Sequence, residues 1–335
     1  MIEVSAGVIT RADGRILICQ RGEGRHHAHL WEFPGGKLEA GESPAECLIR
    51  ELGEELALPV TVGGIRCIRE AEGIRFHFID AHTDAHPVPA EHEDVRFVTP
   101  RELLGFSFCP ADVSVARQLA FAGVRHAFWD FDGTLMDTYP AMVEAFRIGA
   151  AEYGVTISAE RTLELMKDCF THCCEVVSGE SGVPADALAE AFRRHEQEEL
   201  CRGVPPVAGI PEALAAMERA GIRHYVATHR SLYCRDLLDR AGLMGYFSGF
   251  VTKEDGLPRK PAPDMLLHLM ARQGLTPAEC VMIGDRPLDS EAGLAAGMLS
   301  VLIDPEDRFP QGKCDLRIRS AAELAACFAP DWTRA

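Results

Sequence analysis

The stretch FWDFDGTLMD, residues 128–137, decides the fold of the larger part of this chain. The apolar run VRHAFWDF, residues 124–131, predicts a strand that runs into two carboxylates, Asp130 and Asp132. Residues i and i+2 of a strand lie on the same side, so the two carboxylates are expected to be neighbours. Close carboxylates resist joint ionisation unless a cation lies between them or one is protonated. The pair therefore suits a nucleophile and an acid/base beside a metal ion.

Downstream of this strand, helical and strand-like segments alternate. Residues from 139 to about 204 are largely helical, and helices that end in glycine then precede apolar strands. Examples of these pairs are PEALAAMERAG with IRHYVATH, SLYCRDLLDRAG with YFSGFVT, PDMLLHLMARQG with CVMIGD, and LDSEAGLAAG with MLSVLID. This rhythm predicts an α/β fold with a doubly wound parallel sheet, in which ligands bind at the carboxyl ends of the strands.

These features resemble the haloacid dehalogenase (HAD) superfamily, whose first motif is D-x-D-G-T-L-x-D. The later motifs follow in order, with Thr228 in YVATHR, Lys260 in RKPAPD, and Asp285 and Asp289 in MIGDRPLD. Four ordered motifs across this length make a chance match improbable. The resemblance implies a HAD core into which the helical stretch, residues 139–204, is inserted as a cap like that of the phosphoglycolate phosphatases.

The same resemblance implies the roles of the motif residues. Asp130 would attack phosphorus and form an aspartyl-phosphate, while Asp132 would protonate the leaving alcohol and then activate water. Thr228 and Lys260 would hold the phosphoryl oxygens. Residues implied to bind Mg²⁺ are Asp130, the Asp132 carbonyl and Asp285, with Asp289 in support.

A second acidic stretch lies near the start of the chain. Ser43-Pro44-Ala45-Glu46 predicts the beginning of a helix with a capping box. On that helix Glu51, Glu54 and Glu55 share one face. Like charges at this spacing destabilise a helix unless a hard cation such as Mg²⁺ or Mn²⁺ lies among them. A solvated acidic face is the alternative, and the Gly-rich loop immediately upstream disfavours it.

The stretch from Gly36 to Leu58 resembles the Nudix box, G-x5-E-x7-R-E-U-x-E-E-x-G-U, and LWEFPGGK, residues 30–37, resembles its MutT-type branch. The resemblance covers residues 1–123 and implies hydrolysis of a nucleoside triphosphate to monophosphate and pyrophosphate. Implied metal ligands are the Gly36 carbonyl, Glu51, Glu54 and Glu55, with Glu54 also catalytic and Arg50 orienting the glutamates. Ala57 replaces the glycine of the box; if that position is left-handed, alanine costs on the order of 1 kcal/mol.

Other residues of this domain are assigned to the substrate. Glu91, in PAEHEDVRF, falls where MutT-like enzymes keep a general base, and Arg21 is assigned to substrate binding. Asp112 aligns with a position that reads the base edge. An ionised Asp112 only accepts hydrogen bonds, which favours base edges with donors, as in CTP or 8-oxo-dGTP.

Two clusters with metal-binding side chains have simpler interpretations. His26, His27 and His29, in RHHAHLW, are better explained by a solvated loop than by a ligand set. The stretch CFTHCC, residues 169–174, is better explained by a helix with buried cysteines than by a soft metal site.

Composition sets the wider frame. The 335 residues, 47% hydrophobic, suffice for two domains, which we place at 1–123 and 124–335. The first is expected to be an α/β/α sandwich with a mixed sheet, built from a hairpin at 3–20, strands near 65–69, 74–80 and 95–98, and a helix at 111–122. Its helix from Ser43 is expected to bury one face formed by Ala45, Ile49, Leu52 and Leu56.

The net charge of −17 disfavours binding to a nucleic-acid polymer, whereas small phosphorylated substrates remain compatible because bound divalent metals reverse the local field. The N-terminal residues lack the basic and apolar regions of a signal peptide, and no apolar run would span a membrane. The twelve cysteines are scattered, which favours reduced thiols and a cytoplasmic location. The sequence does not indicate an oligomeric state.

The sequence therefore predicts a bifunctional Mg²⁺-dependent phosphohydrolase. One hypothesis joins the two activities, with the HAD site removing phosphate from the nucleoside monophosphate that the Nudix site makes. Two alternatives remain open: the Nudix domain is a nucleotide sensor that regulates the phosphatase, or the HAD domain is a phosphomutase, since the same residues serve both reactions.

Overall fold

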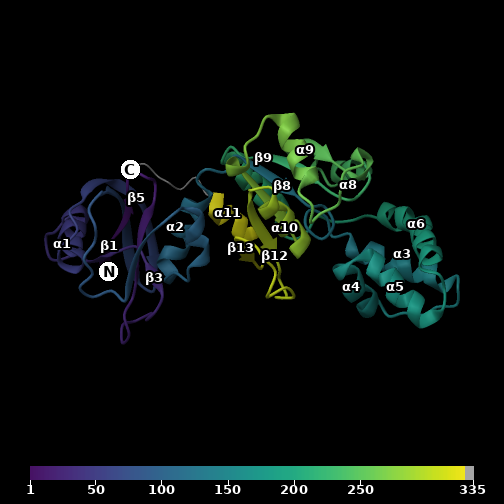
Figure 1. Cartoon of the computed structure of the whole chain (residues 1–335), viewed down its shortest axis with the longest axis horizontal. Coiled ribbons are helices and arrows are strands. Elements are labelled where there is room, and N and C mark those ends of the chain that lie inside the picture. Colours follow the sequence, from purple (N-terminus) through teal and green to yellow (C-terminus); the bar gives the residue numbers. More distant parts are fainter. Residues whose placement is uncertain (329–335) are drawn as a thin grey trace. The chain divides into compact units, whose positions relative to one another are not determined.

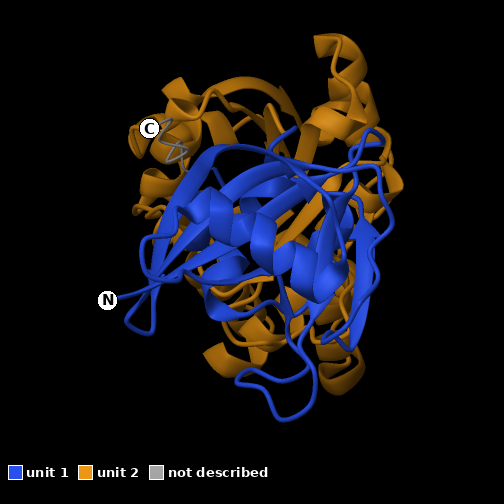
Figure 2. Ribbon diagram, turned by 90° about the vertical axis from the view of Figure 1, so that its left-hand side faces the viewer, with its two compact units in different colours: residues 1–123, 323–335 blue, residues 124–322 orange. Residues whose placement is uncertain are grey.

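The computed structural model describes residues 1–328, which form two compact units (Figures 1 and 2). The first unit contains residues 1–123 and the C-terminal segment that begins at Glu323. The second contains residues 124–322. Within the described residues, every helix is too short or too polar to cross a bilayer.

The first unit is built on a mixed sheet. Its strands are β1 (Ile2–Thr10), β2 (Ile16–Gln20), β3 (Trp31–Glu32), β4 (Gly35–Lys37), β5 (Thr61–Ala71), β6 (Ile74–His82) and β7 (Asp94–Val98). They are ordered β3-β2-β1-β6-β5, with β4 paired to β1 and β7 to β2. β1 and β6 run parallel, whereas β1 and β2 form the antiparallel hairpin that the sequence predicts. The helices are α1 (Pro44–Leu56), η1 (Arg101–Gly105), α2 (Pro110–Phe121) and, from the C-terminal segment, α11 (Ala322–Phe328).

Alternation along the strands divides this core into two layers. In β2, Ile16 and Ile18 pack in the cluster that contains Val115 and Leu119 of α2. Leu17, between them, packs in the cluster that contains the buried residues of α1. Because successive strand residues point to opposite faces, the sheet is covered by α1 on one side and α2 on the other. The predicted α/β/α sandwich is confirmed.

Helix α1 begins as predicted, with the Ser43 side chain accepting from the Glu46 amide in a capping box. It ends at Ala57, whose φ of 47° is left-handed, so alanine stands where glycine is favoured. The predicted apolar face was partly wrong. Leu52 and Leu56 are buried together with Cys47 and Leu48, but Ile49 is 51% exposed. The helix is therefore rotated away from the face we expected, towards Cys47 and Leu48.

The C-terminal helix packs on α2 of the first unit. Arg117 pairs with Glu323 at 3.0 Å, and Gln118 donates to the carbonyl of Ala326 at 3.1 Å. The rings of Phe121 and Phe328 meet edge to face, with centroids 5.3 Å apart. We expected all residues after 123 to belong to the second domain; these contacts place Glu323–Phe328 with the first.

The second unit is built on a parallel sheet. Its strands are β8 (His126–Trp129), β9 (Arg223–Ala227), β10 (Phe247–Val251), β11 (Cys280–Gly284), β12 (Leu299–Ile303) and β13 (Leu316–Ile318). Among the described residues they are ordered β10-β9-β8-β11-β12-β13, with all neighbours parallel. The order reverses around β8, which makes the carboxyl end of β8 the point where such sheets bind ligands. The helices between these strands are α7 (Ile210–Arg219), α8 (Cys234–Arg240), η2 (Met244–Tyr246), η3 (Lys253–Asp255), α9 (Asp264–Gln273), η4 (Pro277–Glu279) and α10 (Pro287–Ala295).

The stretch between β8 and α7 is helical, as the sequence predicts. It forms α3 (Tyr139–Ala151), α4 (Ala159–Asp168), α5 (Phe170–Ser181) and α6 (Ala185–Cys201), which share a hydrophobic core of their own. Cys173 and Cys174 of α5 are buried in that core, whereas Cys169 is exposed. Burial of the two thiols agrees with the interpretation of this stretch as a helix with buried cysteines.

Candidate active sites

Three strand ends bring the predicted HAD residues together. Asp130 follows β8, Thr228 follows β9, and Asp285 follows β11. Trp129, at the end of β8, is in register with Val226 of β9 and Ile283 of β11. Because the three strands are adjacent and parallel and end within one residue of one another, their next residues meet at one edge of the sheet.

Lys260 joins this group from the loop before α9. Its ammonium lies 2.6 Å from Asp130 and 2.6 Å from Asp289, and it donates to the carbonyl of Ala227 at 2.9 Å. The lysine side chain is completely buried. A buried ammonium is tolerated because all of these partners are negative or dipolar.

The carboxylates outnumber the cations that face them, which is the condition for a metal site. Carboxylate oxygens of Asp130, Asp285 and Asp289 all lie within 4.8 Å of one another. One oxygen of Asp130 is buried without a hydrogen-bond partner. Burial and the charge of Asp289 raise the pKa of Asp130 although Lys260 lies beside it, and burial raises the pKa of Asp285 to about 7. A divalent cation bound by oxygen ligands would relieve both effects, so these residues fit Mg²⁺.

Hydrogen bonds from two neighbouring side chains also hold Asp285 in place. It accepts hydrogen bonds from the Thr134 hydroxyl and the Tyr139 hydroxyl, both at 3.1 Å. Gly133, with φ 75°, leaves room for this arrangement, since a Cβ there would overlap the Tyr139 ring and come within 2.6 Å of Asp285. The glycine of the first motif is therefore required by close packing.

Asp132 lies in a different environment from Asp130. Its carboxylate accepts from Arg230 at 2.6 and 2.9 Å and from the Thr138 hydroxyl at 2.6 Å. Arg230 also pairs with Glu196 of α6 at 2.9 Å. Burial alone would raise the pKa of Asp132, but the charge and hydrogen bonds of Arg230 and Thr138 outweigh it and lower that pKa. In this conformation Asp132 is therefore an ionised partner of Arg230 and not a proton donor.

The sequence did not identify Arg230, Glu196 or His229. Thr228 is buried, and its hydroxyl accepts from the amide of Arg230 at 3.1 Å. The ring of His229 accepts from the amide of Lys260 at 2.9 Å, and burial lowers its pKa to about 4, so it is neutral. His229 and Arg230 could have been suspected because they directly follow Thr228 in THR, residues 228–230. No sequence pattern indicated Glu196.

A pocket of about 810 Å³ borders this group and is lined by α4 and by the loops after β11 and β12. Lys167 and Arg286 bring positive charge to it, and Asp285 forms part of its wall. Asp130 does not line the pocket and is only 2% exposed. The wall also carries the carboxylates of Asp137, Glu160, Asp304 and Glu306, and contact of a bound molecule with Asp130 requires local movement.

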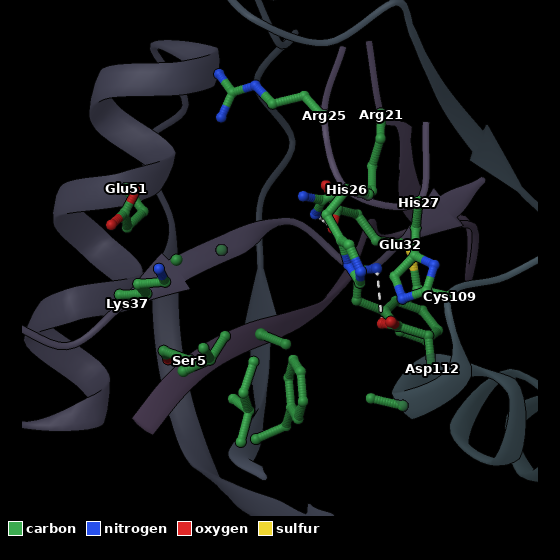
Figure 3. Close-up of a pocket in the computed structure, with 18 of the residues that line it drawn as sticks. Ser5, Arg21, Arg25, His26, His27, Glu32, Lys37, Glu51, Cys109 and Asp112 are labelled. Atoms are coloured by element: carbon green, nitrogen blue, oxygen red, sulfur yellow. Dashed lines mark hydrogen bonds and ion pairs between the residues drawn. The ribbon is translucent and has the colours of Figure 1, made fainter. Parts of the chain in front are cut away.

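A second pocket, of about 430 Å³, lies in the first unit (Figure 3). Glu51, on α1, stands at one side of it and Asp112, on α2, at the other, with Arg21 and Glu32 between them (Figure 3). Predicted site residues that line it are Arg21, Gly36, Glu51, Glu55, Glu91 and Asp112.

Arg50 organises the acidic end of this pocket. Its guanidinium pairs with Glu42 and Glu51 at 2.9 Å each and with Glu54 at 3.2 Å. The Glu51 carboxylate lies against the backbone of Gly36, where any Cβ would overlap it. The Nudix-box glycine and arginine thus hold Glu51 in place from two sides.

Glu55, like Glu51, is half-buried. One of its oxygens has no hydrogen-bond partner, and burial, with nearby Glu51 and Glu32, raises its pKa to about 7 although His92 opposes the shift. His92 lies 3.6 Å from Glu32 and 3.8 Å from Glu55, with a side chain only 6% exposed. An oxygen-binding cation beside Glu51 and Glu55 fits these unmatched charges. His92 and Glu32 were not identified from the sequence, although each lies within a stretch that we singled out.

Glu54 and Glu91 are less well placed. Glu54 is 62% exposed, pairs with Arg50 and does not line the pocket. Among the described residues, the Glu51, Glu54 and Glu55 carboxylates do not form a group with all ligand atoms within 4.8 Å. Glu91 lines the pocket but pairs with Arg25. The structure therefore gathers Gly36, Glu51 and Glu55, and leaves Glu54 and Glu91 at the edge.

Asp112 is not the ionised acceptor that we assumed. It is 4% exposed, and one of its oxygens accepts from the amide of Phe33 at 3.0 Å. Burial raises its pKa to about 8. At neutral pH the carboxyl is mainly protonated, so it both donates and accepts, as an amide does. Arg21, close by, pairs with Glu32 and donates to the carbonyl of His26 at 2.7 Å.

Comparisons with known proteins match a different family to each unit. A family model described as haloacid dehalogenase-like hydrolase matches residues 127–303, and one described as NUDIX domain matches residues 1–119. The CTP pyrophosphohydrolase of Escherichia coli (strain K12) is 41% identical over 132 residues, which are 38% of this chain and 96% of that protein. Hexitol phosphatase A of the same strain is 28% identical over 207 residues, which are 61% of this chain and 94% of that protein.

Solved structures share the fold of the second unit. A HAD family hydrolase from Deinococcus radiodurans R1, with bound phosphate and sodium, superposes with a TM-score of 0.52 at 21% identity. The match covers 62% of this chain and 99% of that one. At this identity the likeness concerns the fold alone.

Proposed function

This chain belongs to the haloacid dehalogenase-like hydrolases and carries an N-terminal NUDIX domain, and from this premise we propose that it is a bifunctional phosphohydrolase dependent on Mg²⁺, with Mn²⁺ as a substitute. The Nudix site would hydrolyse a nucleoside triphosphate to monophosphate and pyrophosphate. The HAD site would hydrolyse a small phosphomonoester. The observation that supports the proposal is that Asp130, Thr228 and Asp285 follow three adjacent parallel strands, with Lys260 paired to Asp130.

In the HAD site, Asp130 is the nucleophile and forms an aspartyl-phosphate. Lys260 and Thr228 hold the phosphoryl oxygens, with Lys260 offsetting the charge gathered there. Mg²⁺ held by Asp130, the Asp132 carbonyl and Asp285, with Asp289 in support, would neutralise charge on the transferred group. The helices α3–α6 form the cap, and Lys167 of α4 faces the pocket that receives the substrate.

Asp132 is the proton shuttle of this site, and its pairing with Arg230 sets a condition on that role. Proton delivery requires that Asp132 leave Arg230 and become protonated near the leaving oxygen. Because Arg230 also holds Glu196 of α6, a movement of the cap would change the hold on Asp132.

In the Nudix site, the separation of Glu51 from Asp112 across one pocket supports a nucleotide bound with its phosphates at α1 and its base at α2. Gly36, Glu51 and Glu55 would hold the metal, and Arg50 orients Glu51. Bound Mg²⁺ would activate a water and neutralise the polyphosphate. Glu54 would complete the ligand set, which requires its release from Arg50. Glu91 would act as the base, which requires its release from Arg25.

Protonated Asp112 supports a base edge that presents an acceptor beside a donor. Cytosine offers N3 and its 4-amino group in that arrangement, so one carboxyl can donate to the first and accept from the second. The similarity to a CTP pyrophosphohydrolase supports the same choice. Guanine also presents an acceptor, O6, beside the N1–H donor, so it is the similarity to a CTP pyrophosphohydrolase that leads us to favour a CTP-like substrate over 8-oxo-dGTP.

The two point variants Glu54→Gln and Asp130→Asn test the assignment in the full chain, because each leaves the other site intact. Pyrophosphate release from CTP should fall at least ~10²-fold in Glu54→Gln and stay unchanged in Asp130→Asn. Phosphate release from phosphomonoesters should show the reverse, with a loss of at least ~10³-fold in Asp130→Asn. Absence of pyrophosphate release at enzyme-like rates in Asp130→Asn would instead favour a Nudix sensor. Isomerisation of a sugar phosphate without phosphate release would favour a phosphomutase.

Sequential action of the two sites is a narrower hypothesis, motivated by their fusion and their matching chemistry. In it, CMP released by the Nudix site is a substrate of the HAD site. Glu54→Gln, supplied with CMP, sugar phosphates and phosphoglycolate, separates the possibilities. Turnover of CMP would support sequential action of the two sites, whereas turnover of only the other phosphomonoesters would exclude it.

A further inference from the structure

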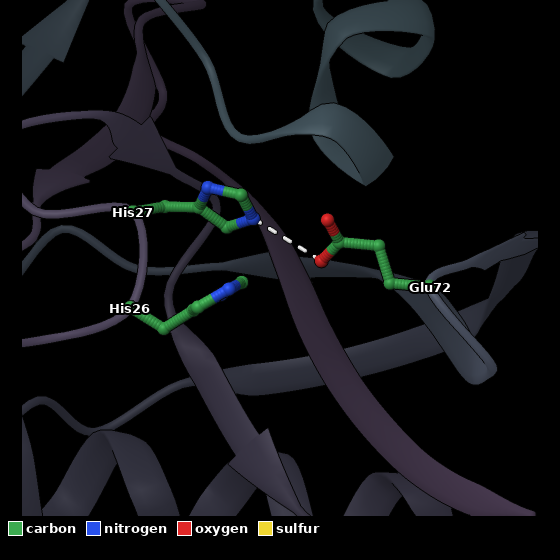
Figure 4. A group of neighbouring side chains, drawn as sticks. All are labelled: His26, His27 and Glu72. Atoms are coloured by element: carbon green, nitrogen blue, oxygen red, sulfur yellow. Dashed lines mark hydrogen bonds and ion pairs between the residues drawn. The ribbon is translucent and has the colours of Figure 1, made fainter.

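Two histidines and a glutamate meet at the entrance of the Nudix pocket. His26 and His27 lie on the loop between β2 and β3, and Glu72 lies on the turn between β5 and β6 (Figure 4). One ligand atom of each lies within 4.8 Å of the other two. All three line the pocket that also contains Glu51 and Glu55. The group therefore brings together a loop and a hairpin turn that are far apart in sequence.

The backbone fixes the directions of these side chains. Arg21 donates to the carbonyl of His26 at 2.7 Å, and the amide of Leu30 donates to the carbonyl of His27 at 3.2 Å. His27 has φ 57° and Glu72 has φ 52°, both in the left-handed region that costs a non-glycine residue about 1 kcal/mol or more. His29 on the same loop is also left-handed, with φ 65°, and Glu72 with Gly73 forms the two-residue turn of the β5–β6 hairpin, so these conformations fix the side-chain directions and do not by themselves indicate a ligand.

The spacing suits a metal ion with nitrogen and oxygen ligands. His27 Nε2 lies 3.1 Å from Glu72 Oε2, and the His26 and His27 rings meet edge to face with centroids 4.0 Å apart. Ligand atoms of a tetrahedral Zn²⁺ site, at about 2.0–2.1 Å from the ion, are about 3.3 Å from one another. His₂Glu sets of this kind leave a fourth position open for water or substrate.

A hydrogen bond between His27 and Glu72 is the simpler explanation, but it leaves His26 unexplained. The His26 ring takes no part in that hydrogen bond, yet it packs on the His27 ring with one nitrogen near both His27 and Glu72. A cation bound by all three side chains would account for this convergence. His29, on the same loop, is different: it pairs with Glu93 at 2.7 Å and does not line the pocket.

We propose that His26, His27 and Glu72 bind a transition-metal ion of the Zn²⁺, Ni²⁺ or Co²⁺ type at the entrance of the Nudix pocket. The site is separate from the Mg²⁺ site proposed at Glu51 and Glu55, because imidazole selects borderline metals whereas Mg²⁺ prefers oxygen. Binding ties the β2–β3 loop to the β5–β6 turn. Water or an incoming nucleotide would fill the coordination position that three protein ligands leave open.

The test is a Co²⁺ titration of the full chain in excess Mg²⁺, which fills the oxygen sites, with the visible absorption of bound Co²⁺ as the readout. The wild type should bind one Co²⁺ with visible bands, and Zn²⁺ should displace it. His27→Ala and Glu72→Gln should each weaken binding at least ~tenfold. His29→Ala, from the same loop, is the matched control and should titrate as the wild type does.

Equal Co²⁺ binding in wild type and His27→Ala would overturn the proposal, and so would the absence of Co²⁺ absorption. A measurement without mutation covers the case in which a variant misfolds. In the wild type, Zn²⁺ should shift the ring proton signals of His26 and His27 in NMR spectra and leave those of His29 in place. If Zn²⁺ shifted the ring proton signals of all three histidines, or of none, the proposed metal site would also be contradicted. None of these readouts depends on hydrolysis, so they stand apart from the proposed function.

Discussion

The two candidate sites differ in how far the protein itself balances their charges. At the carboxyl end of β8, buried carboxylates surround a buried lysine, and Asp130 and Lys260 are already in contact. Beside α1, Arg50 bridges Glu51 and Glu54, and Glu54 faces solvent. The first site is assembled by the fold, whereas in the second Glu54 stays at the solvent-exposed edge in a pair with Arg50.

This contrast reflects where the residues come from. The HAD residues lie on separate strands and loops, so their meeting depends on the whole sheet. The Nudix glutamates lie on one helix, so they are neighbours in any state that keeps the helix. A defect in the HAD site should therefore appear in stability, and a defect in the Nudix site mainly in metal binding.

The largest expected effect is on Lys260. Lys260→Met leaves Asp130 and Asp289 buried without their cation, which should lower the free energy of unfolding of the second unit by about 3–5 kcal/mol. Urea denaturation in the absence of divalent metal measures the loss. Lys253→Met, which changes an exposed lysine of the same unit, is the control and should unfold as the wild type does. An equally small change in both would mean that the HAD site is not assembled through this lysine.

The second prediction concerns Asp132. Arg230→Gln removes the charge that lowers the pKa of Asp132, so that pKa should rise. Asp132 is then protonated up to higher pH, and the alkaline limb of the phosphatase pH profile should move to higher pH. The profile of Arg235→Gln, in which a nearby arginine outside the site is changed, should not move. If the alkaline limb stays at the same pH in Arg230→Gln, Asp132 is not the group that donates the proton.

The third prediction turns to the Nudix pocket. The pKa of Asp112 is about 8, so the carboxyl is neutral below that pH and loses its donor above it. The KM for CTP should therefore rise, roughly up to tenfold, as the pH increases through 8. Asp112→Asn keeps a donor and an acceptor at every pH, and its KM should stay flat over the same range. A parallel rise in both proteins would show that another group titrates.

The smallest effect is expected at the end of α1. Ala57→Gly removes the strain of a left-handed alanine and should stabilise the first unit by about 1 kcal/mol. Thermal unfolding measures the gain. Ala122→Gly is the control, because Ala122 ends α2 with φ −58° and gains nothing from glycine. Unchanged Nudix activity in Ala57→Gly would confirm that the box position affects stability and not ligation.

Much of this molecule could be predicted from the sequence. Carboxylates at the ends of apolar runs predicted where Asp130 and Asp285 lie, because a parallel sheet leaves few alternatives for residues at its strand ends. The capping box predicted the start of α1, and Ala57 could be questioned because the left-handed region is restricted for alanine. Local rules sufficed for these residues.

The remaining features depend on packing. The protonation of Asp112 follows from its burial, which no local pattern indicates. The pairing of Arg230 with Glu196 joins residues from the sheet and from α6, and the exposure of Ile49 results from how α1 is rotated on its sheet. His26 and His27 could be noticed in the sequence, but their partner Glu72 lies in another turn.

The position of α11 has a practical consequence. The polypeptide leaves the first unit at Gly123 and returns to it at Glu323. The HAD domain is therefore inserted into the sequence of the first unit. One cut after residue 123 would release a Nudix fragment without the helix that covers Phe121. To separate the two enzymes intact, the piece 124–322 must be excised and the two flanking ends rejoined.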